Sequence, residues 1–544
     1  MTATLLPRWL LLLLTLLMWS SPGSGGEAAP LVVKTDRGEV RGTLRNGARE
    51  FRGIPYAAPT TGERRWTLAT PAEPWRGVLD ATEFRGACPQ VVRFNLTEAS
   101  DNEDCLVVNV STPAAGGRNL PVFVYIHGGA SVGGAGSLYR LDAIARQGVV
   151  AVSLNYRLGA LGFLAHPALG RDGNGAWAVE DQRLALRWVQ RNIAAFGGDP
   201  NRVTLGGESA GAGAVCTHLA NPRLSAGLFH QAVITSGACL VPRGRASEAE
   251  AMGLTLAAAV GCSDPQTALR CLRKVPLAEL LAKQTELANG RLVTFSPTSG
   301  SDVNPVDGAA AMAAGEFMRV PVLMGATRDE LRLYVAYDLQ AGKVLDASTY
   351  PAWLQDVYGR SEAERQARIP ERVAERYPLV PGEPPAVALG TAMSDFIPSI
   401  GIGGCVQLHS GSVMARYTPL WQWAFADRAA PVLGVGITRE PDPGFELGAV
   451  HAAEINYFFP NFDNTHKMAA PDLAPPSQAL SEQMLEFLAQ FVRTGQPAAR
   501  GLPAWPRFTG GATVMWMEPG QTGLRDAGAI HQCDFWKSLY PDRL

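Results

Sequence analysis

The sequence predicts an α/β fold, in which a doubly wound, mostly parallel central sheet is flanked by helices and carries helical cap insertions. Three observations support this prediction. Apolar and β-branched residues occur in continuous rather than alternating runs, which indicates strands buried on both faces. Helical patterns separate these runs, as in parallel sheets. One run ends in a sharp turn of small residues that leads directly into an Ala-rich helical pattern.

The N-terminal segment has the layout of a signal peptide. One basic residue, Arg8, precedes an apolar run from Trp9 to Trp19, and small residues follow. The run is shorter than the ~20 apolar residues that span a bilayer, so we expect no stable membrane span, with an uncleaved anchor as the alternative. We therefore divide the chain into a signal peptide, residues 1–28, and a single domain, residues 29–544. The expected location is secreted or periplasmic.

The rest of the chain shows no seam between domains, although 544 residues would allow more than one. It contains no Gly/Ser-rich linker, no charge run and no internal repeat, which favours one large domain with long insertions. A formal charge of -2 argues against nucleic acid as a partner. A hydrophobic fraction of 47% is typical of a globular protein with a sizeable core.

Eight cysteines behind a signal peptide indicate an oxidising compartment and some disulfides. Cys262 and Cys271 enclose a short loop, and Cys88 and Cys105 enclose a polar one, so both pairs have the spacing of local crosslinks. The alternative for each pair is two buried free thiols. Spacing alone does not pair the other four cysteines.

The first predicted elements are extended. Residues 31–42 alternate around a Gly-containing turn and predict an edge hairpin. Residues 51–59 are extended and punctuated by proline. Buried strands are predicted where continuous apolar runs begin, at Leu106, Pro121 and Val149, and the second run ends in H-G-G-A.

A helix is predicted between the last of these strands and the turn of small residues. Within residues 179–200, Leu184, Trp188 and Ile193 fall on one helical face. A pair of glycines that begins at Gly197 then ends the helix. Strand, helix, strand, turn and helix is the order of a doubly wound α/β fold.

Three later strands and two helical regions complete the prediction. The strands lie at residues 232–237, 320–326 and 420–427. Residues 245–292 and 347–393 are mostly helical and charged, and we interpret them as cap insertions over the sheet.

The turn of small residues carries the first candidate for chemistry. Ser209 lies at its corner between Gly207 and Gly211, in the pattern G-x-S-x-G. A serine on a sharp strand-to-helix turn takes a strained backbone conformation, and the two glycines avoid collisions with neighbouring elements. The helix beside Ser209 points unpaired N–H groups to the place where an oxyanion would form. The alternative is an ordinary tight turn in which Ser209 caps the helix.

Several longer segments carry the motifs of one enzyme family. They are F51-R-G-I-P-Y-A, E103-D-C-L-V-V-N-V, Y125-I-H-G-G-A, N155-Y-R-L-G-A-L-G-F-L, the stretch from Asp181 to Gly211, and L228-F-H-Q-A-V-I-T-S-G. Through them the chain resembles the type-B carboxylesterase/cholinesterase family of α/β-hydrolases along nearly its whole mature length. The resemblance implies an α/β-hydrolase fold and a serine esterase that hydrolyses carboxylic esters.

The resemblance also implies a catalytic triad. The family's acid corresponds to Glu330, with Asp329 as the competing candidate and a solvated acidic loop as the alternative. The family's histidine corresponds to His451, whereas His127 is expected to support the oxyanion loop. The order Ser209, Glu330, His451 is the order that this fold uses.

This triad predicts an acyl-enzyme mechanism that needs no cofactor and no metal. His451 takes the proton of Ser209 as Ser209 attacks an ester carbonyl, and Glu330 fixes the imidazole tautomer. Water then hydrolyses the acyl-enzyme of the small-molecule ester. The backbone N–H groups expected to bind the oxyanion are those of Gly128, Gly129 and Ala210.

Family positions imply supporting roles for further residues. Glu208 and Ser236 are expected to lie behind the triad, with a helix or turn cap as the equally weighted alternative for Ser236. Arg52 and Glu103 would form a buried ion pair. The implied disulfides are Cys88–Cys105, Cys262–Cys271 and Cys405–Cys533, with Cys216 and Cys239 left free.

Departures from the family bear on the substrate. In cholinesterases the first disulfide loop carries a tryptophan that binds a quaternary ammonium by cation–π attraction, and residues 88–105 contain none. The acyl-pocket tryptophan of related esterases is also missing after Thr235. Arg332 would face the entrance and favour an anionic ester, or face solvent in the alternative interpretation. We expect neutral or anionic esters, for example of polycarboxylic acids or natural products, rather than choline esters.

Two rival functions are weighed against this one. A lipase or an amidase could use the same triad, and turnover of short-chain against long-chain esters separates the lipase from the esterase. A catalytically inactive adhesion-type relative would have lost Ser209, Glu330 or His451, and all three are present.

Overall fold

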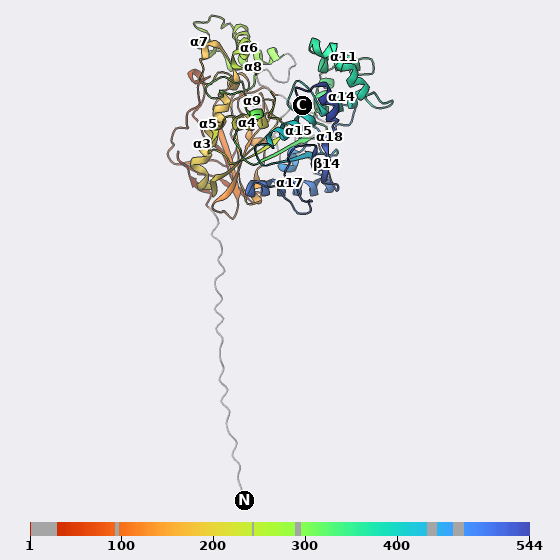
Figure 1. Ribbon diagram of the computed structural model, residues 1–544. Helices are drawn as coiled ribbons and strands as arrows, with labels where there is room; N and C mark the ends of the chain where they lie inside the picture. The colour runs from red at the N-terminus through yellow and green to blue at the C-terminus, as the bar shows by residue number, and fades with distance from the viewer. Residues whose placement is uncertain (2–29, 93–96, 242–243, 289–294, 432–442, 461–472) are drawn as a thin grey trace.

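The computed structural model describes all residues except 2–29, 93–96, 242–243, 289–294, 432–442 and 461–472 (Figure 1). The apolar run of the predicted signal peptide therefore lies outside the described residues. Among the residues that are described, no helix has the length and apolar content needed to cross a membrane.

A large central sheet organises the described chain. Its strand order is β14-β13-β12-β11-β10-β9-β7-β8-β6-β4-β3. The strands are β3 (Thr43–Arg45), β4 (Ala48–Pro55), β6 (Val107–Pro113), β7 (Leu120–Ile126), β8 (Val150–Leu154), β9 (Gly198–Glu208), β10 (Gln231–Thr235), β11 (Val322–Thr327), β12 (Leu420–Phe425), β13 (Thr513–Met517) and β14 (Gly523–Asp526).

The central strands pair in parallel, in the spatial order β8, β7, β9, β10, β11, β12 and β13. The strands at the two edges, which are β6, β4 and β3 on one side and β14 on the other, form antiparallel pairs. This is the mostly parallel, doubly wound sheet of an α/β-hydrolase, which confirms the predicted fold class. Because parallel strands share a direction, their carboxyl ends meet along one edge of the sheet.

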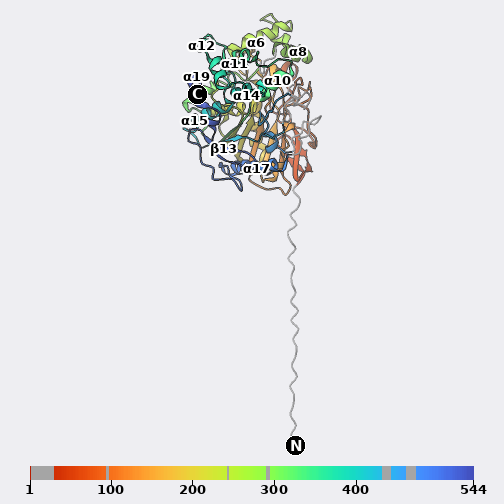
Figure 2. The same cartoon turned by 90° about the vertical axis from the view of Figure 1, so that its right-hand side faces the viewer.

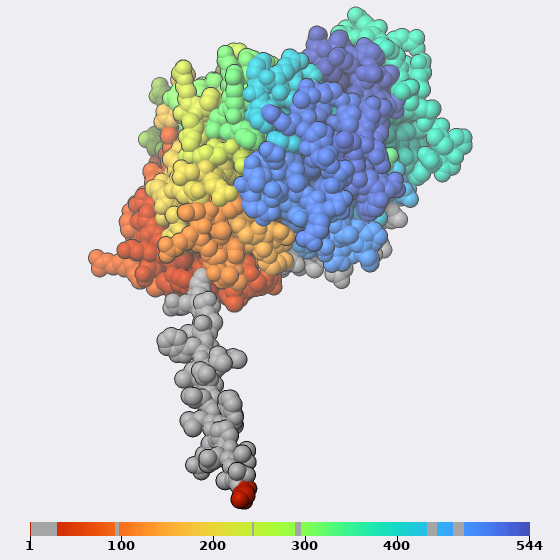
Figure 3. Space-filling model, turned by 60° about the horizontal axis from the view of Figure 1, so that its bottom comes forward, coloured from red at the N-terminus to blue at the C-terminus, as the bar shows by residue number. Residues whose placement is uncertain are grey.

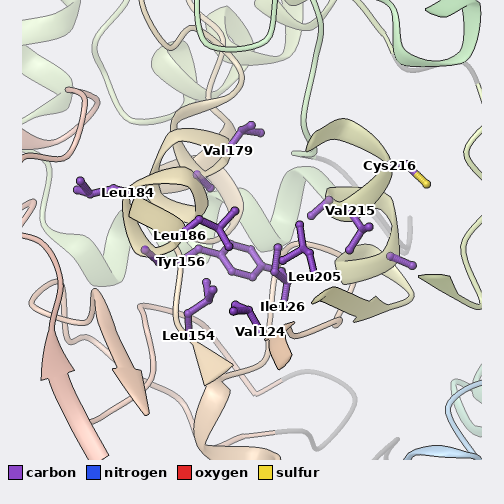
Figure 4. Packing of buried hydrophobic residues seen from close by; sticks show 14 of the residues in the cluster. Val124, Ile126, Leu154, Tyr156, Val179, Leu184, Leu186, Leu205, Val215 and Cys216 are labelled. Carbon is purple, nitrogen blue, oxygen red and sulfur yellow. The ribbon is translucent and has the colours of Figure 1, made fainter. Parts of the chain in front are cut away.

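The two faces of the sheet carry separate cores because successive side chains on a strand point in opposite directions. On β7, Val124 and Ile126 pack with α3 (Trp177–Asn192) and α4 (Ala210–Leu219) in one buried cluster. Figure 4 shows both residues below the side chains of these two helices. Phe123 and Tyr125 point the other way, into a cluster with α1 (Asp142–Arg146) and α17 (Pro475–Thr494). The predicted burial on both faces is confirmed.

Segments distant in sequence lie side by side on the second face. Helix α17 packs against β7. On the surface, the blue C-terminal part of the chain lies beside the orange N-terminal part (Figure 3). The predicted edge hairpin is also present, as β1 (Val32–Lys34) and β2 (Glu39–Arg41), and it continues into a small sheet with β5 (Val78–Asp80).

Two helical insertions follow the carboxyl ends of β10 and β11, where the sequence predicts caps. The first contains α6 (Ala246–Ala259), α7 (Ala268–Leu272) and α8 (Leu277–Ala288). The second contains α11 (Tyr350–Tyr358), α12 (Glu362–Gln366), α13 (Ile369–Arg376) and α14 (Pro385–Asp395). Both lie at the same end of the molecule in two perpendicular views (Figures 1 and 2). They flank the edge of the sheet where the candidate catalytic residues are expected.

The remaining helices are short or lie at the C-terminal end. They are η1 (Gly62–Arg64), η2 (Gly136–Leu138), α2 (Gly159–Phe163), η3 (Pro167–Leu169), η4 (Ile193–Phe196), α5 (Pro222–Ser225), α9 (Gly308–Ala314), α10 (Arg332–Gln340), α15 (Gly404–Met414), α16 (Ile455–Phe458), α18 (Ala527–Ile530) and α19 (Cys533–Leu539). The predicted glycine stop lies at the end of η4: α3 ends at Asn192, η4 follows it directly, and Gly197 then takes a left-handed conformation with φ 94°.

Four disulfides crosslink the described chain, which corrects one expectation. The expected pairs Cys88–Cys105, Cys262–Cys271 and Cys405–Cys533 are formed. Cys216 and Cys239, expected to be free, form a fourth disulfide with a Cα–Cα distance of 5.2 Å. The reason is tertiary: α4, which carries Cys216, packs against β10, and Cys239 lies in the turn that follows β10.

The expected ion pair between Arg52 and Glu103 is wrong. Arg52 pairs instead with Glu50, two residues earlier on β4, where alternate side chains share a face. Glu103 accepts hydrogen bonds from Arg65, at 2.8 Å from Nε and 2.6 Å from Nη2. Each buried charge is therefore matched, but by a partner that the family position does not indicate.

Candidate active site

Ser209 occupies the corner between β9 and α4 in a strained conformation, with φ 57° and ψ -122°. The flanking glycines permit this corner. A Cβ at Gly207 would lie 2.5 Å from the main chain of Gly211, and one at Gly211 would lie 2.1 Å from the carbonyl oxygen of Ile126. The local sequence therefore folds into the sharp turn that presents the Ser209 hydroxyl above the sheet.

The structure brings the three predicted triad residues together from three loops. Ser209 Oγ lies 2.9 Å from Nε2 of His451, and Nδ1 of His451 lies 2.7 Å from Oε2 of Glu330. Glu330 follows β11, and its second oxygen accepts a hydrogen bond from the N–H of Thr327 at 2.8 Å. Glu330 is fully buried and His451 is 4% exposed. This arrangement excludes the alternative of a solvated acidic loop at Glu330.

The competing acid, Asp329, has different partners. Its carboxylate accepts hydrogen bonds from Arg428 at 2.8 and 3.1 Å and from the N–H of Ala449 at 3.1 Å. The carboxylate that contacts Nδ1 of His451 is that of its neighbour Glu330.

The loop after β7 lies against the nucleophile. A Cβ at Gly128 would be 2.9 Å from the carbonyl oxygen of Glu208 and 3.1 Å from the Cβ of Ser209, so a side chain there would have to displace the main chain of the elbow. Beneath this loop His127 is buried, stacks on Tyr156 and lies 2.9 Å from the Gly128 carbonyl oxygen. Burial lowers the pKa of His127 to about 4, so this histidine is neutral.

The same loop has positive φ angles at Gly129 (103°), Ala130 (55°) and Ser131 (62°). Such angles in non-glycine residues cost energy and are found mostly at functional sites. Within the described residues, no group accepts a hydrogen bond from the N–H of Gly129 or Ala130. The N–H of Ala210, at the start of α4, also has no acceptor in the described part of the chain. Ala130 was not predicted, although it follows the two glycines of H-G-G-A.

Two further buried carboxyl groups surround the histidine. Oε1 of Glu208 lies 3.1 Å from Nε2 of His451, and burial, helped by the charge of Glu330, raises the pKa of Glu208 to about 7. Glu454 is fully buried, and burial followed by the charges of Glu208 and Glu330 raises its pKa well above the ordinary range. Glu454 was not predicted; it lies in the turn that begins at His451, directly before α16.

These carboxyl groups decide the protonation of His451. Burial alone would disfavour the imidazolium, but the charges of Glu208, Glu330 and Glu454 outweigh it and raise the pKa of His451 to about 9. The catalytic base must be neutral to take a proton from Ser209. The active fraction therefore grows as the pH rises through this pKa.

We expect kcat/KM for an uncharged ester to rise with pH through an apparent pKa above the ordinary value of about 6.5 for histidine. Glu208→Gln removes the charge nearest Nε2 of His451, so it should move the midpoint of the profile to lower pH. A pH–rate profile from about 5 to 10 measures both effects. Glu371→Gln, on the exposed surface of α13, is the control. A wild-type midpoint at or below 6.5, or no movement in Glu208→Gln, would contradict the assignment.

Ser236 is buried at the end of β10 with φ 52°. Its N–H donates to the carbonyl oxygen of Gly325 at 2.8 Å, which joins the ends of β10 and β11. Its hydroxyl has no hydrogen-bond partner in the described part of the chain. The hydroxyl therefore caps no described helix.

Tyr334 on α10 forms part of the site and was not predicted. Its ring centroid lies 5.7 Å from that of His451. Burial, and then the charges of Glu208 and Glu330, raise the pKa of its hydroxyl, so Tyr334 stays neutral.

Arg332 was expected to face the entrance of the site or, in the alternative interpretation, solvent, and both expectations are wrong. Arg332 is 5% exposed, so it faces neither the entrance nor solvent. Its guanidinium donates to the carbonyl oxygen of Glu446 at 3.0 Å and to Oγ1 of Thr391 at 2.9 Å. The side chain is buried because α10 and α14 pack closely. A glycine at position 390 allows this packing, because a Cβ there would lie 2.7 Å from Cγ of Arg332.

The chain is similar to known carboxylesterases along most of its length. Residues 29–536 match the carboxylesterase family. Para-nitrobenzyl esterase of Bacillus subtilis (strain 168) is 33% identical over 490 residues, which cover 88% of this chain and 92% of the relative. Fumonisin B1 esterase of Sphingopyxis macrogoltabida is 33% identical over 521 residues, covering 90% and 88%. Human cocaine esterase is 31% identical over 557 residues, covering 96% and 94%.

A solved structure of PNB esterase has the same fold. It superposes with a TM-score of 0.75 at 28% sequence identity, covering 94% of this chain and 99% of that one. The similarity therefore extends over both the sheet and the helical insertions.

Proposed function

The chain belongs to the carboxylesterase family, and on this premise we propose that it hydrolyses carboxylic esters through an acyl-enzyme on Ser209. One observation carries the proposal. Ser209, His451 and Glu330 form a continuous hydrogen-bonding chain with distances of 2.9 and 2.7 Å. Nucleophile, base and orienting acid in this order are what acyl transfer requires.

Residues of the site can carry out each step of ester hydrolysis. Ser209 Oγ attacks the carbonyl carbon while its proton passes to Nε2 of His451, and Glu330 stabilises the imidazolium that forms. The leaving alkoxide then takes this proton, and water attacks the acyl-enzyme with His451 again as the base. The N–H groups proposed to bind the oxyanion are those of Gly128, Gly129, Ala130 and Ala210.

Covalent labelling tests the nucleophile directly. An organophosphate should modify the protein once, on the peptide that contains Ser209, with loss of ester turnover in proportion to labelling. His451→Ala should slow labelling strongly because the hydroxyl loses its base. A label that maps to another serine, or full labelling without loss of turnover, would contradict the proposal.

We propose uncharged esters as the substrates. Glu208 and Glu330 both lie against the imidazole of His451, and their negative charges disfavour an anionic group close to the nucleophile. Arg332, the residue expected to favour anionic esters, is buried elsewhere. Residues 88–105 also lack the tryptophan with which cholinesterases bind the quaternary ammonium. The relatives are named for different esters, so family membership alone does not choose among them.

For matched pairs of equal acyl length, we expect an uncharged alkyl ester to be turned over with a kcat/KM at least about tenfold higher than a choline ester. The reason is that residues 88–105 supply no tryptophan to compensate the desolvation of the ammonium group. Side-by-side kinetics with both esters measures the ratio, and a series of short-chain to long-chain acyl groups in the same assay separates esterase from lipase behaviour. A preference for choline would overturn the substrate proposal and leave the nucleophile untouched.

Export of the protein is a further part of the proposal. The first residues have the layout of a signal peptide, and the four disulfides suit an oxidising compartment. We propose a secreted or periplasmic enzyme whose single domain spans residues 29–544.

A further inference from the structure

Glu330 and His451 lie on separate loops, and the residue next to Glu330 joins these loops. The N–H of Asp329 donates to the carbonyl oxygen of Ala449 at 2.8 Å, and Oδ2 of Asp329 accepts from the N–H of Ala449 at 3.1 Å. Asp329 thus holds both main-chain groups of the residue two positions before His451. One residue further, the N–H of His451 donates to the carbonyl oxygen of Glu330 at 3.2 Å.

A glycine makes this close approach possible. Gly448 has φ 72°, and a Cβ there would lie 2.5 Å from Oδ2 of Asp329. Any other residue at this position would push the carboxylate away from Ala449, so the sequence G-A-V-H is adapted to the Asp329 side chain.

Two arginines hold the carboxylate in place. Asp329 is 3% exposed, and a buried carboxylate needs a charged partner. Arg428, just after β12, donates two hydrogen bonds to it. Nε of Arg332 lies 3.6 Å from Oδ1, while the other two nitrogens of its guanidinium bind Glu446 and Thr391.

The contacts of Arg332 extend the connection in two directions. Glu446 lies on the loop that leads to His451, and Thr391 lies on α14 of the second helical insertion. One side chain therefore links the acid loop, the histidine loop and the insertion that flanks the site.

We infer that Asp329 and Arg332 are positioning residues for His451, which fix the histidine loop against the Glu330 loop. The inference rests on the proposed function of the triad. Neither residue contacts the imidazole, so each acts through the main chain of residues 446–449. A displacement of about 1 Å at a catalytic group can cost about a hundredfold in rate, so loss of this clamp should affect the chemical step more than substrate binding.

Asp329→Ala tests the inference against a matched control, Asp181→Ala. Asp181 is also a buried carboxylate with two hydrogen bonds from one guanidinium, that of Arg157, but it lies on α3, which carries no triad residue. We expect Asp329→Ala to lower kcat by about 10- to 100-fold with KM within about threefold of the wild type. The control should lower the melting temperature without this selective loss of kcat.

Two readouts separate positioning from general destabilisation. In Asp329→Ala the midpoint of the pH–rate profile should move to lower pH, because His451 loses part of its contact with Glu330. Asp329→Asn should recover part of kcat, since its amide oxygen can still accept from the N–H of Ala449. Wild-type kcat and midpoint in Asp329→Ala, or an equal loss of kcat in Asp329→Ala and Asp181→Ala, would overturn the inference.

If Asp329→Ala does not fold, Arg332→Lys decides. Its single ammonium lacks the fork that spans Glu446 and Thr391, so kcat should fall by about 3- to 10-fold at unchanged KM. Wild-type kcat in this variant overturns the inference. An inactive Ser209→Ala together with fully active Asp329→Ala would remove the positioning role alone, whereas an active Ser209→Ala would remove the proposed function.

Discussion

Ser209→Ala is expected to lower kcat/KM for esters by about 10⁴-fold or more, because members of a triad act as a unit and removal of the nucleophile leaves only binding and the oxyanion donors. The fold should survive. The hydroxyl contacts His451 and contributes nothing to either core, and alanine keeps the Cβ at the strained corner. Turnover of an activated uncharged ester and the melting temperature, measured on the same preparation, give both values.

Ser225→Ala provides the control for removal of a buried hydroxyl. Ser225 is fully buried on α5, and its hydroxyl has no hydrogen-bond partner among the described residues. Its replacement should leave kcat/KM within about twofold, because a substitution that removes no hydrogen bond and creates no unpaired group has a small effect. Ester turnover in Ser209→Ala above about 0.1% of the wild type, after correction by active-site titration, would contradict an acyl-enzyme on Ser209.

The parts of the fold that follow from local sequence were predictable. The elbow at Ser209 depends on glycines two residues to either side, and the end of η4 depends on Gly197. Continuous apolar runs predict the buried strands. Because helical patterns alternate with these runs, helices are expected to cover both faces of the sheet. Glu330 and His451 were assigned through the family motifs rather than by such local rules.

The predictions that were wrong concern contacts between segments that are distant in the sequence. Cys216 meets Cys239 only because α4 lies on β10. Arg332 is buried only because α14, which belongs to an insertion, packs against α10. Sequence spacing carries no information on either contact, and a family position states which residue is present but not which partner it finds.

Glu454 illustrates a third case, in which the signal was local but its meaning was not. A glutamate directly before a helix, as Glu454 is before α16, would normally be interpreted as part of a polar helix start. Only the complete burial of Glu454 in the tertiary structure makes it a carboxyl group that changes the pKa of His451. The pH dependence of the enzyme is therefore a property of the tertiary structure.

The second large effect is expected from Gly211→Ala, which adds one methyl group behind the nucleophile. The new Cβ would lie 2.1 Å from the carbonyl oxygen of Ile126 and about 3 Å from the main chain of His127, at 2.9 and 3.0 Å. These atoms belong to β7 and to the loop with Gly128 and Gly129. No side-chain rotation relieves a clash between Cβ and main-chain atoms, so either α4 moves away from β7 or the oxyanion loop moves away from Ser209.

We expect Gly211→Ala to lower the free energy of unfolding by about 3 kcal/mol or more and to abolish measurable ester turnover, because overpacking of a rigid interior shifts backbone as well as side chains. Gly308→Ala, in α9, is the matched control. Its Cβ would meet only the Cβ of Ala220, at an ordinary 3.6 Å, and alanine favours a helix. Denaturant unfolding and ester kinetics on both variants test the prediction. Gly211→Ala that unfolds with the wild-type midpoint and retains turnover would show that the elbow tolerates a side chain at Gly211.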